Sequence, residues 1–165
     1  MIIRRQNVGG RRLSDTVPAE VKEIDYDLED FLTGIKEFSS SDLAGVLEYQ
    51  RFDTSPVLGT IKVSPDHAAY LIKLMVRLSG EDGQLSLSAS CNDGVMLLMF
   101  KLSRGMPDDE EMVEVCRAAR RAGFRVWPGD ESIYVEADIT KKEYITLGAK
   151  KPNAFTFTLN KVFYY

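Results

Sequence analysis

The sequence is poor in the residues from which reactive, cross-linked or metal-binding sites are commonly built. Its 165 residues include one histidine, His67, and two cysteines, Cys91 and Cys116. Two cysteines form no disulfide framework and stand at no metal-binding spacing, so we expect a reduced, cytoplasmic chain. No Ser/His/Asp set, phosphate-binding loop, zinc spacing or dinucleotide fingerprint is present. The residues therefore offer no catalytic motif, no metal site and no cofactor site.

Long apolar runs and an excess of positive charge are also lacking. No run approaches the roughly 18 apolar residues of a membrane span. The first twelve residues carry arginines without a following apolar stretch, so they do not form a secretory signal. The net charge of −4 is untypical of a general nucleic-acid binder. We therefore expect neither a membrane nor a nucleic acid among the partners.

What remains is the composition of a globular domain, with 44% hydrophobic and 28% charged residues. Helical periodicity predicts three helices, near 28–42, 65–79 and 108–122. Asp27 is a candidate N-cap for the first helix, and Ser64 followed by Pro65 opens the second. Four consecutive acidic residues, Asp108–Glu111, begin the third, where negative charge suits the helix dipole.

Turn signals between apolar segments predict about seven strands, mostly in hairpins. Asn92-Asp93-Gly94 and Pro128-Gly129-Asp130 are typical hairpin turns. The almost continuously apolar segment Val95–Leu102 should be a central strand. The predicted fold is α+β, a two-layer sandwich in which one mixed sheet carries three helices on one face.

Three segments are distinguished along the chain. Residues 1–24 form an N-terminal tail or an irregular lead-in, 25–139 the α/β domain, and 140–165 a β-prone extension of the same domain. The extension ends in Phe163, Tyr164 and Tyr165, which we expect either to cap the sheet or to mediate dimerisation or partner docking.

The order helix, two strands, helix, hairpin, helix, hairpin resembles the ATP-binding domain of sensor histidine kinases, the GHKL superfamily. Three passages carry the resemblance over residues 25–139. Asp25–Leu32 is similar to the segment that opens that domain, and Val63–Met75 looks like its strand-to-helix passage "D-P-D-x-L-x-x-V-L-x-N-L-L". Ala118–Trp127 is similar to its last helix and terminal hairpin.

The family's ATP site does not carry over with this resemblance. Lys73 and Arg77 stand where the family has the asparagines that hold Mg²⁺, and a cationic donor cannot ligate a metal. Ser103 replaces the adenine-reading aspartate, and Gly105 matches one of the two motif glycines. Pro107 then leads within one residue into the acidic helix, which leaves no room for the glycine-rich lid. The resemblance thus implies a nucleotide site lost at Lys73, Arg77, Ser103 and Gly105.

Other residues invite functional interpretations that their context disfavours. His67 is expected to be a solvated helix residue, because the kinase's phosphorylated histidine belongs to a separate hairpin that this sequence lacks. Cys91 stands beside a turn and is expected near the surface, but it has no neighbouring residue in the sequence that would activate a thiol. Arginines cluster around the last helix, and a solvated face or a docking surface for an acidic partner explains them: Arg117, Arg120, Arg121 and Arg125.

The leading functional hypothesis is a non-catalytic regulatory or protein-binding module on a degenerate histidine-kinase ATPase fold, in bacterial two-component or phosphorelay signalling. It needs no cofactor, its partner is a protein, and homodimerisation is left open. The alternative is an ATP-binding kinase or ATPase domain of the same type with an atypical nucleotide site, so the sequence leaves enzymatic activity open while leaning against it. A third reading is an unrelated α+β binding scaffold.

Overall fold

The structure, a computed structural model, describes residues 17–18, 20–41, 43–53 and 57–141. Three helices are α1 (Leu28–Ser41), α2 (Pro65–Leu78) and α3 (Asp109–Ala122). The strands are β1 (Ile24–Asp27), β2 (Leu47–Arg51), β3 (Gly59–Val63), β4 (Leu85–Asn92), β5 (Val95–Leu102), β6 (Arg125–Pro128), β7 (Ile133–Asp138) and β8 (Thr140–Lys141). Within these residues, no helix has the length and apolar character needed to cross a bilayer.

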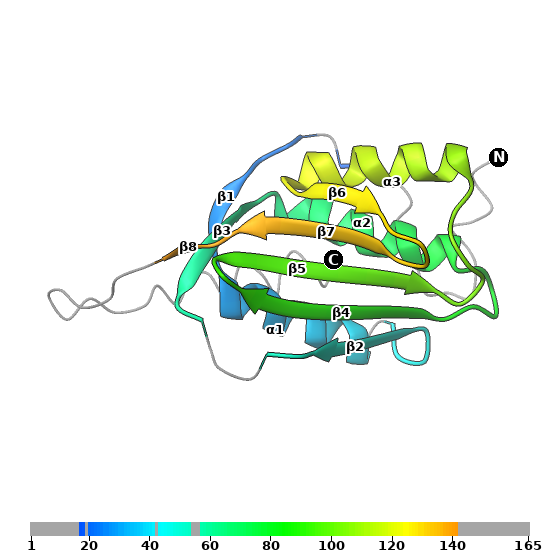
Figure 1. The fold of residues 1–165 in the computed structure, drawn as a ribbon, viewed down its shortest axis with the longest axis horizontal. Helices are drawn as coiled ribbons and strands as arrows, with labels where there is room; N and C mark the ends of the chain where they lie inside the picture. Colours follow the sequence, from blue (N-terminus) through cyan, green and yellow to red (C-terminus); the bar gives the residue numbers. More distant parts are fainter. Residues whose placement is uncertain (1–16, 19, 42, 54–56, 142–165) are drawn as a thin grey trace, which may run out of the picture.

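The expected sandwich is confirmed. The larger sheet has the strand order β2-β4-β5-β7-β6 and is mixed, because β2 runs parallel to β4 while the other pairs are antiparallel. The helices lie behind this sheet and leave its front face uncovered (Figure 1). β5 is the middle strand, as its apolar sequence predicted.

The strands do not form the single sheet that was expected. β1, β3 and β8 pair antiparallel in a separate three-stranded sheet at one end of the molecule (Figure 1). β1 is not among the strands expected from the sequence, because Asp25 and Asp27 give it poor strand composition. Its pairing with β3, Ile24 opposite Val63, supplies the order that local sequence does not.

Helix caps mostly follow the sequence signals. The Asp27 carboxylate accepts a hydrogen bond from the Asp30 N–H at 3.1 Å. Asp108 and Glu111 form a reciprocal capping box at the start of α3, and Gly123 ends it with a left-handed φ of 102°. Ser64 stands at the N-cap of α2, but its hydroxyl makes no capping bond.

Alternation along the central strands places the core between the larger sheet and the helices. In β4 the apolar residues Leu85, Leu87 and Ala89 are fully buried, and the serines between them are only partly covered. The hairpin to β5 turns at Asp93 and Gly94, which both adopt positive φ as a two-residue turn requires.

Candidate functional site

The region that should hold a nucleotide by resemblance lies at α2 and in the loop between β5 and α3. On α2, Lys73 is half-buried and Arg77 is exposed. In the loop, the Ser103 N–H donates to the Gln84 carbonyl, and the Ser103 hydroxyl accepts from the Gln84 N–H, both at 2.9 Å. The Ser103 hydroxyl, which the resemblance would place where the family has an aspartate, is therefore bonded to the backbone next to β4.

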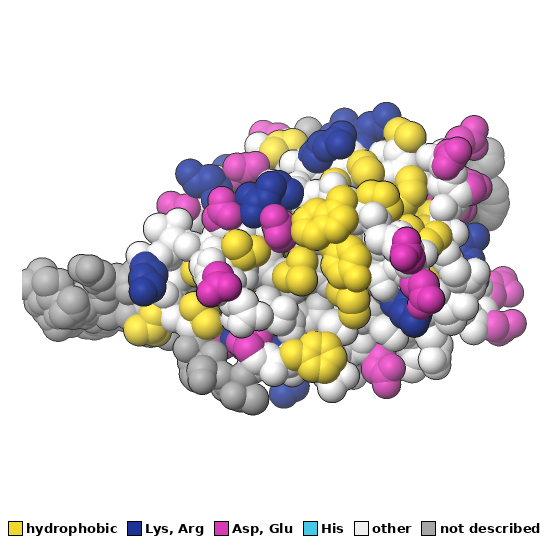
Figure 2. Space-filling view, in the orientation of Figure 1, with side chains coloured by type: hydrophobic (Ala, Val, Ile, Leu, Met, Phe, Trp, Pro, Cys, Tyr) yellow, Lys and Arg dark blue, Asp and Glu magenta, His cyan; other side chains and the backbone are white. Residues whose placement is uncertain are grey.

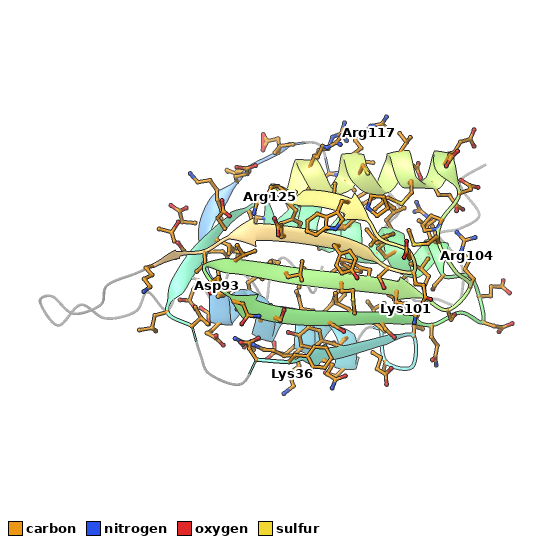
Figure 3. The ribbon with its side chains drawn as sticks, viewed as in Figure 1. Lys36, Asp93, Lys101, Arg104, Arg117 and Arg125 are labelled. Atoms are coloured by element: carbon orange, nitrogen blue, oxygen red, sulfur yellow. The ribbon has the colours of Figure 1, made fainter. Side chains whose placement is uncertain are left out.

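The rest of this loop is tied to the start of α3. Gly105 turns with φ 101°, and its N–H donates to the Leu102 carbonyl at 3.0 Å. Arg104, labelled in Figure 3, then forms an ion pair with Glu111 of the capping box. The N-terminal N–H groups of α3 thus face carboxylates of the chain itself, and a phosphate would meet the same negative charge.

A basic surface runs along the C-terminal half of α3. Arg117, Arg120 and Arg121 are exposed, and none has an ion pair within the described ranges. Arg117 projects from α3 away from the sheet (Figure 3). Arg125, grouped with them from the sequence, differs: on β6 its guanidinium binds Glu136 and Asp138, each at 2.9 Å. We call Arg117, Arg120 and Arg121 the α3 arginine ridge.

A cavity of about 170 Å³ lies between α2 and α3 next to this ridge. Arg117, Arg121 and Glu114 line it from α3, and His67 and Tyr70 from α2. The two helices run side by side there, since the Ser64 N–H before α2 donates to the Ala122 carbonyl at the end of α3. Arg120 does not line this cavity, and neither do Lys73, Arg77, Ser103 and Gly105.

The expectation of a solvated His67 is wrong, because its side chain is 1% exposed. Its Nδ1 lies 3.1 Å from the Ser64 hydroxyl, which explains why that serine does not cap the helix. Its Nε2 is buried without a hydrogen-bond partner among the described residues. Burial, with the charge of Arg121 adding to it, holds the pKa of His67 below its ordinary value.

A second polar group joins Glu29, Arg51 and Asp53 where α1, β2 and the following loop meet. Beside it, Cys91 is buried rather than near the surface, and burial raises the pKa of its thiol to about 11. Such a thiol is protonated at neutral pH, so it is a poor nucleophile. No sequence signal links Glu29 to Arg51, since the two residues come from separate elements.

The uncovered face of the larger sheet carries a band of large side chains (Figure 2). Trp127 of β6 stacks on Tyr134 of β7 with ring centroids 5.5 Å apart. Tyr134 in turn pairs with Met99 of β5. Trp127 is 40% exposed, which is high for the only tryptophan of the chain.

Phe163, Tyr164 and Tyr165 lie outside the described residues, as does the extension from residue 142 onward. Within the described part of the chain, no group of three His, Cys, Asp or Glu side chains is arranged to hold a metal ion.

No model of a known family matches the sequence, and no curated protein does either. In fold the chain is similar to catalytic domains of histidine kinases, the class that the sequence resembles. With the nucleotide-free catalytic domain of ThkA it shares 9% identity at a TM-score of 0.48, over 74% of this chain and 99% of that one. Acinetobacter baumannii AdeS shares 13% identity with it at a TM-score of 0.41, over 75% of this chain and 70% of that one. The histidine kinase domain of Erythrobacter litoralis EL346 shares 18% identity at a TM-score of 0.37, over 76% of this chain and 71% of that one.

Proposed function

We propose that this chain is a non-catalytic regulatory or protein-binding module, built on a histidine-kinase ATPase-like fold that no longer binds Mg-ATP. The observation that carries the proposal is the occupied start of α3. Asp108 and Glu111 cap the helix, Arg104 pairs with Glu111, and Asp109 and Glu110 add further negative charge. In the domains that this chain resembles, phosphates and a glycine-rich lid take this place.

The neighbouring residues support the same reading. Lys73 and Arg77 offer no lone pair to Mg²⁺. The Ser103 hydroxyl already accepts a backbone N–H from Gln84, and it carries no charge with which to fix an adenine amino group. A domain that keeps such a fold without binding nucleotide can still bind a protein partner through its surface. The resemblance suggests a two-component or phosphorelay setting for that partner.

Thermal unfolding with and without Mg-ATP tests the loss of nucleotide binding. A ligand at 100 times its dissociation constant stabilises the folded state by about 2.7 kcal/mol, so millimolar Mg-ATP would reveal a dissociation constant on the order of tens of micromolar by a visible rise in Tm. We expect no magnesium-dependent rise, with ATP plus EDTA and Mg²⁺ alone as controls. A reproducible rise that needs both components would establish the alternative, an ATP-binding domain with an atypical site.

The α3 arginine ridge is the surface proposed for an acidic protein partner. Its three guanidinium groups are exposed and without ion pairs in the described residues, although the whole chain is acidic. Binding of a fluorescent poly-glutamate peptide provides a defined probe. We expect Arg120→Glu to weaken it strongly, while the same reversal at Lys36, exposed on α1 and away from α3 (Figure 3), has a smaller effect. Equal weakening by both would mean that only net charge matters.

A further inference from the structure

The cavity between α2 and α3 combines features that a structural role leaves unexplained. His67 is almost fully buried, yet its Nε2 has no partner in the described ranges. A buried polar atom without a partner costs free energy, so such an atom beside a cavity is available to bond a group that enters it. The Pro18 carbonyl lies near the ring and favours its protonated form, but it does not satisfy Nε2 with a hydrogen bond of ordinary geometry.

The charge of the cavity indicates the sign of that group. Arg117 and Arg121 stand one helical turn apart on α3, so their side chains lie on the same face. Both line the cavity, and neither has an ion pair among the described residues. Glu114, one turn before Arg117, is the single carboxylate in the lining. Two guanidinium groups therefore face one carboxylate, and an anion would balance them.

The size of the cavity limits the ligand to a small group. Its volume of about 170 Å³ is several times the roughly 30 Å³ share of a water molecule. It is well below the roughly 300–1,000 Å³ of sites for drug-sized molecules, so the cavity cannot enclose a whole nucleotide. A single phosphoryl group does, and guanidinium forks match its oxygens in geometry as well as charge.

We propose that Arg117, Arg121 and His67 form a binding site for one phosphoryl group, either free phosphate or the end of a phosphomonoester. The two arginines contribute the charge and several N–H donors from α3. His67 contributes Nε2–H from α2, with Ser64 fixing the ring through Nδ1. Tyr70 lines the same cavity and has a hydroxyl that can donate to a further oxygen. This site is separate from the lost nucleotide site and does not depend on that loss.

The only histidine of the chain makes the site directly observable by NMR. At constant ionic strength, titration with inorganic phosphate should shift the His67 Cε1–H resonance saturably. Arg121→Gln should weaken the apparent affinity about tenfold or more, because a charged hydrogen-bonding group is lost. Arg120→Gln is the matched control, since this exposed arginine of the same helix does not line the cavity, and its affinity should stay within about twofold.

Further measurements distinguish free phosphate from a phosphomonoester and control for misfolding of the variants. O-phosphoserine compared with serine shows whether a phosphomonoester enters as well as the free ion, and either result supports the site. Arg117→Gln repeats the test at a second exposed position. His67→Asn keeps a group that can bond Ser64 but removes Nε2, so calorimetry should show weaker phosphate binding by a folded variant.

Two results would overturn the proposal: no saturable shift with phosphate, or equal weakening by Arg120→Gln and Arg121→Gln. Neither result bears on Mg-ATP. Conversely, magnesium-dependent stabilisation by ATP that persists in Arg121→Gln would refute the proposed function and leave the phosphoryl site intact.

Discussion

Arg51 at the end of β2 forms a two-point ion pair with Glu29 of α1, with Nη1–Oε1 at 2.7 Å and Nη2–Oε2 at 2.9 Å. The same guanidinium binds Asp53, with Nη2–Oδ2 at 2.8 Å. Both carboxylates also accept backbone N–H groups, Glu29 from Val57 and Asp53 from Cys91. Arg51 thus holds together the edge of the larger sheet, a helix and a loop.

Replacing Arg51 should destabilise the domain substantially. The three side chains are only 15–28% exposed, so Arg51→Met leaves two poorly solvated carboxylates without their cation. We expect a loss of about 1–3 kcal/mol in the free energy of unfolding, measured by urea denaturation at pH 7. Arg125→Met, at an exposed ion pair of β6, is the control and should cost at most about 1 kcal/mol. Equal costs would contradict this account.

The contribution of Arg51 should also depend on pH. Hydrogen bonds from Arg51 hold the pKa of Asp53 below its ordinary value. Burial alone would raise the pKa of Glu29, but bonds from Arg51 and Val57 outweigh it and lower that pKa too. Lowered carboxyl pKa values stabilise the fold above about pH 4, and that stability is lost as the pH falls through the folded-state values. The difference between wild type and Arg51→Met should therefore shrink in acid. A stability difference that stays constant down to pH 2 would contradict this pH dependence.

The sequence predicts those features of this fold that depend on residues close together in the chain. Helix α3 starts at a capping residue, Asp108, and ends at Gly123, because both positions need a particular residue type locally. Burial of His67 is different, since it depends on α3 packing beside α2 from more than 40 residues further along the chain. The pairing of Glu29 with Arg51 is equally non-local. Such contacts follow from tertiary packing, for which one sequence carries no periodic signal.

Gly59 is required by the close approach of β8 to β3. A Cβ added there would lie 2.6 Å from Ile139 Cγ2 and 2.7 Å from the Thr140 carbonyl oxygen. We expect Gly59→Ala to cost about 1–3 kcal/mol, because the second contact is backbone that cannot rotate away. Hydrogen exchange at Thr140, which pairs with Thr60, should accelerate. In Gly80→Ala, strained only by a φ of +87° with open space around it, exchange at Thr140 should be unchanged.

The stack of Trp127 on Tyr134 should stabilise the β6 edge of the larger sheet. Their ring planes differ by 17° and the residues are register partners. A double-mutant cycle with Trp127→Leu and Tyr134→Leu should give a coupling free energy of about 0.5–1.5 kcal/mol. The cycle of Trp127→Leu with Lys101→Met, at an exposed side chain on β5, serves as the uncoupled control. Additive effects in both cycles would show that the stack contributes only through its buried area.

His67 should titrate below the ordinary histidine pKa of about 6.5 in the folded chain. Burial is the main cause, and the charge of Arg121 from α3 adds to it. Asp66 on the same helix and the Pro18 carbonyl from the lead-in oppose this lowering. Arg117, Glu114 and Tyr70 complete the charged and titratable groups around the shared cavity. A proton therefore binds the unfolded chain more tightly than the folded one.

The sign of the stability effect follows from that difference. Well above pH 6.5 the ring is neutral in both states, and its titration does not affect stability there. As the pH falls from 6.5 to the folded-state pKa, protonation favours the unfolded chain and stability declines. An NMR titration of the single Cε1–H signal should show the lowered pKa. Arg121→Gln should move the pKa upward, whereas Arg120→Gln, which keeps the cavity intact, should leave it unchanged. A wild-type pKa at or above 6.5 without added anion would show that the ring is better solvated or paired than its burial implies.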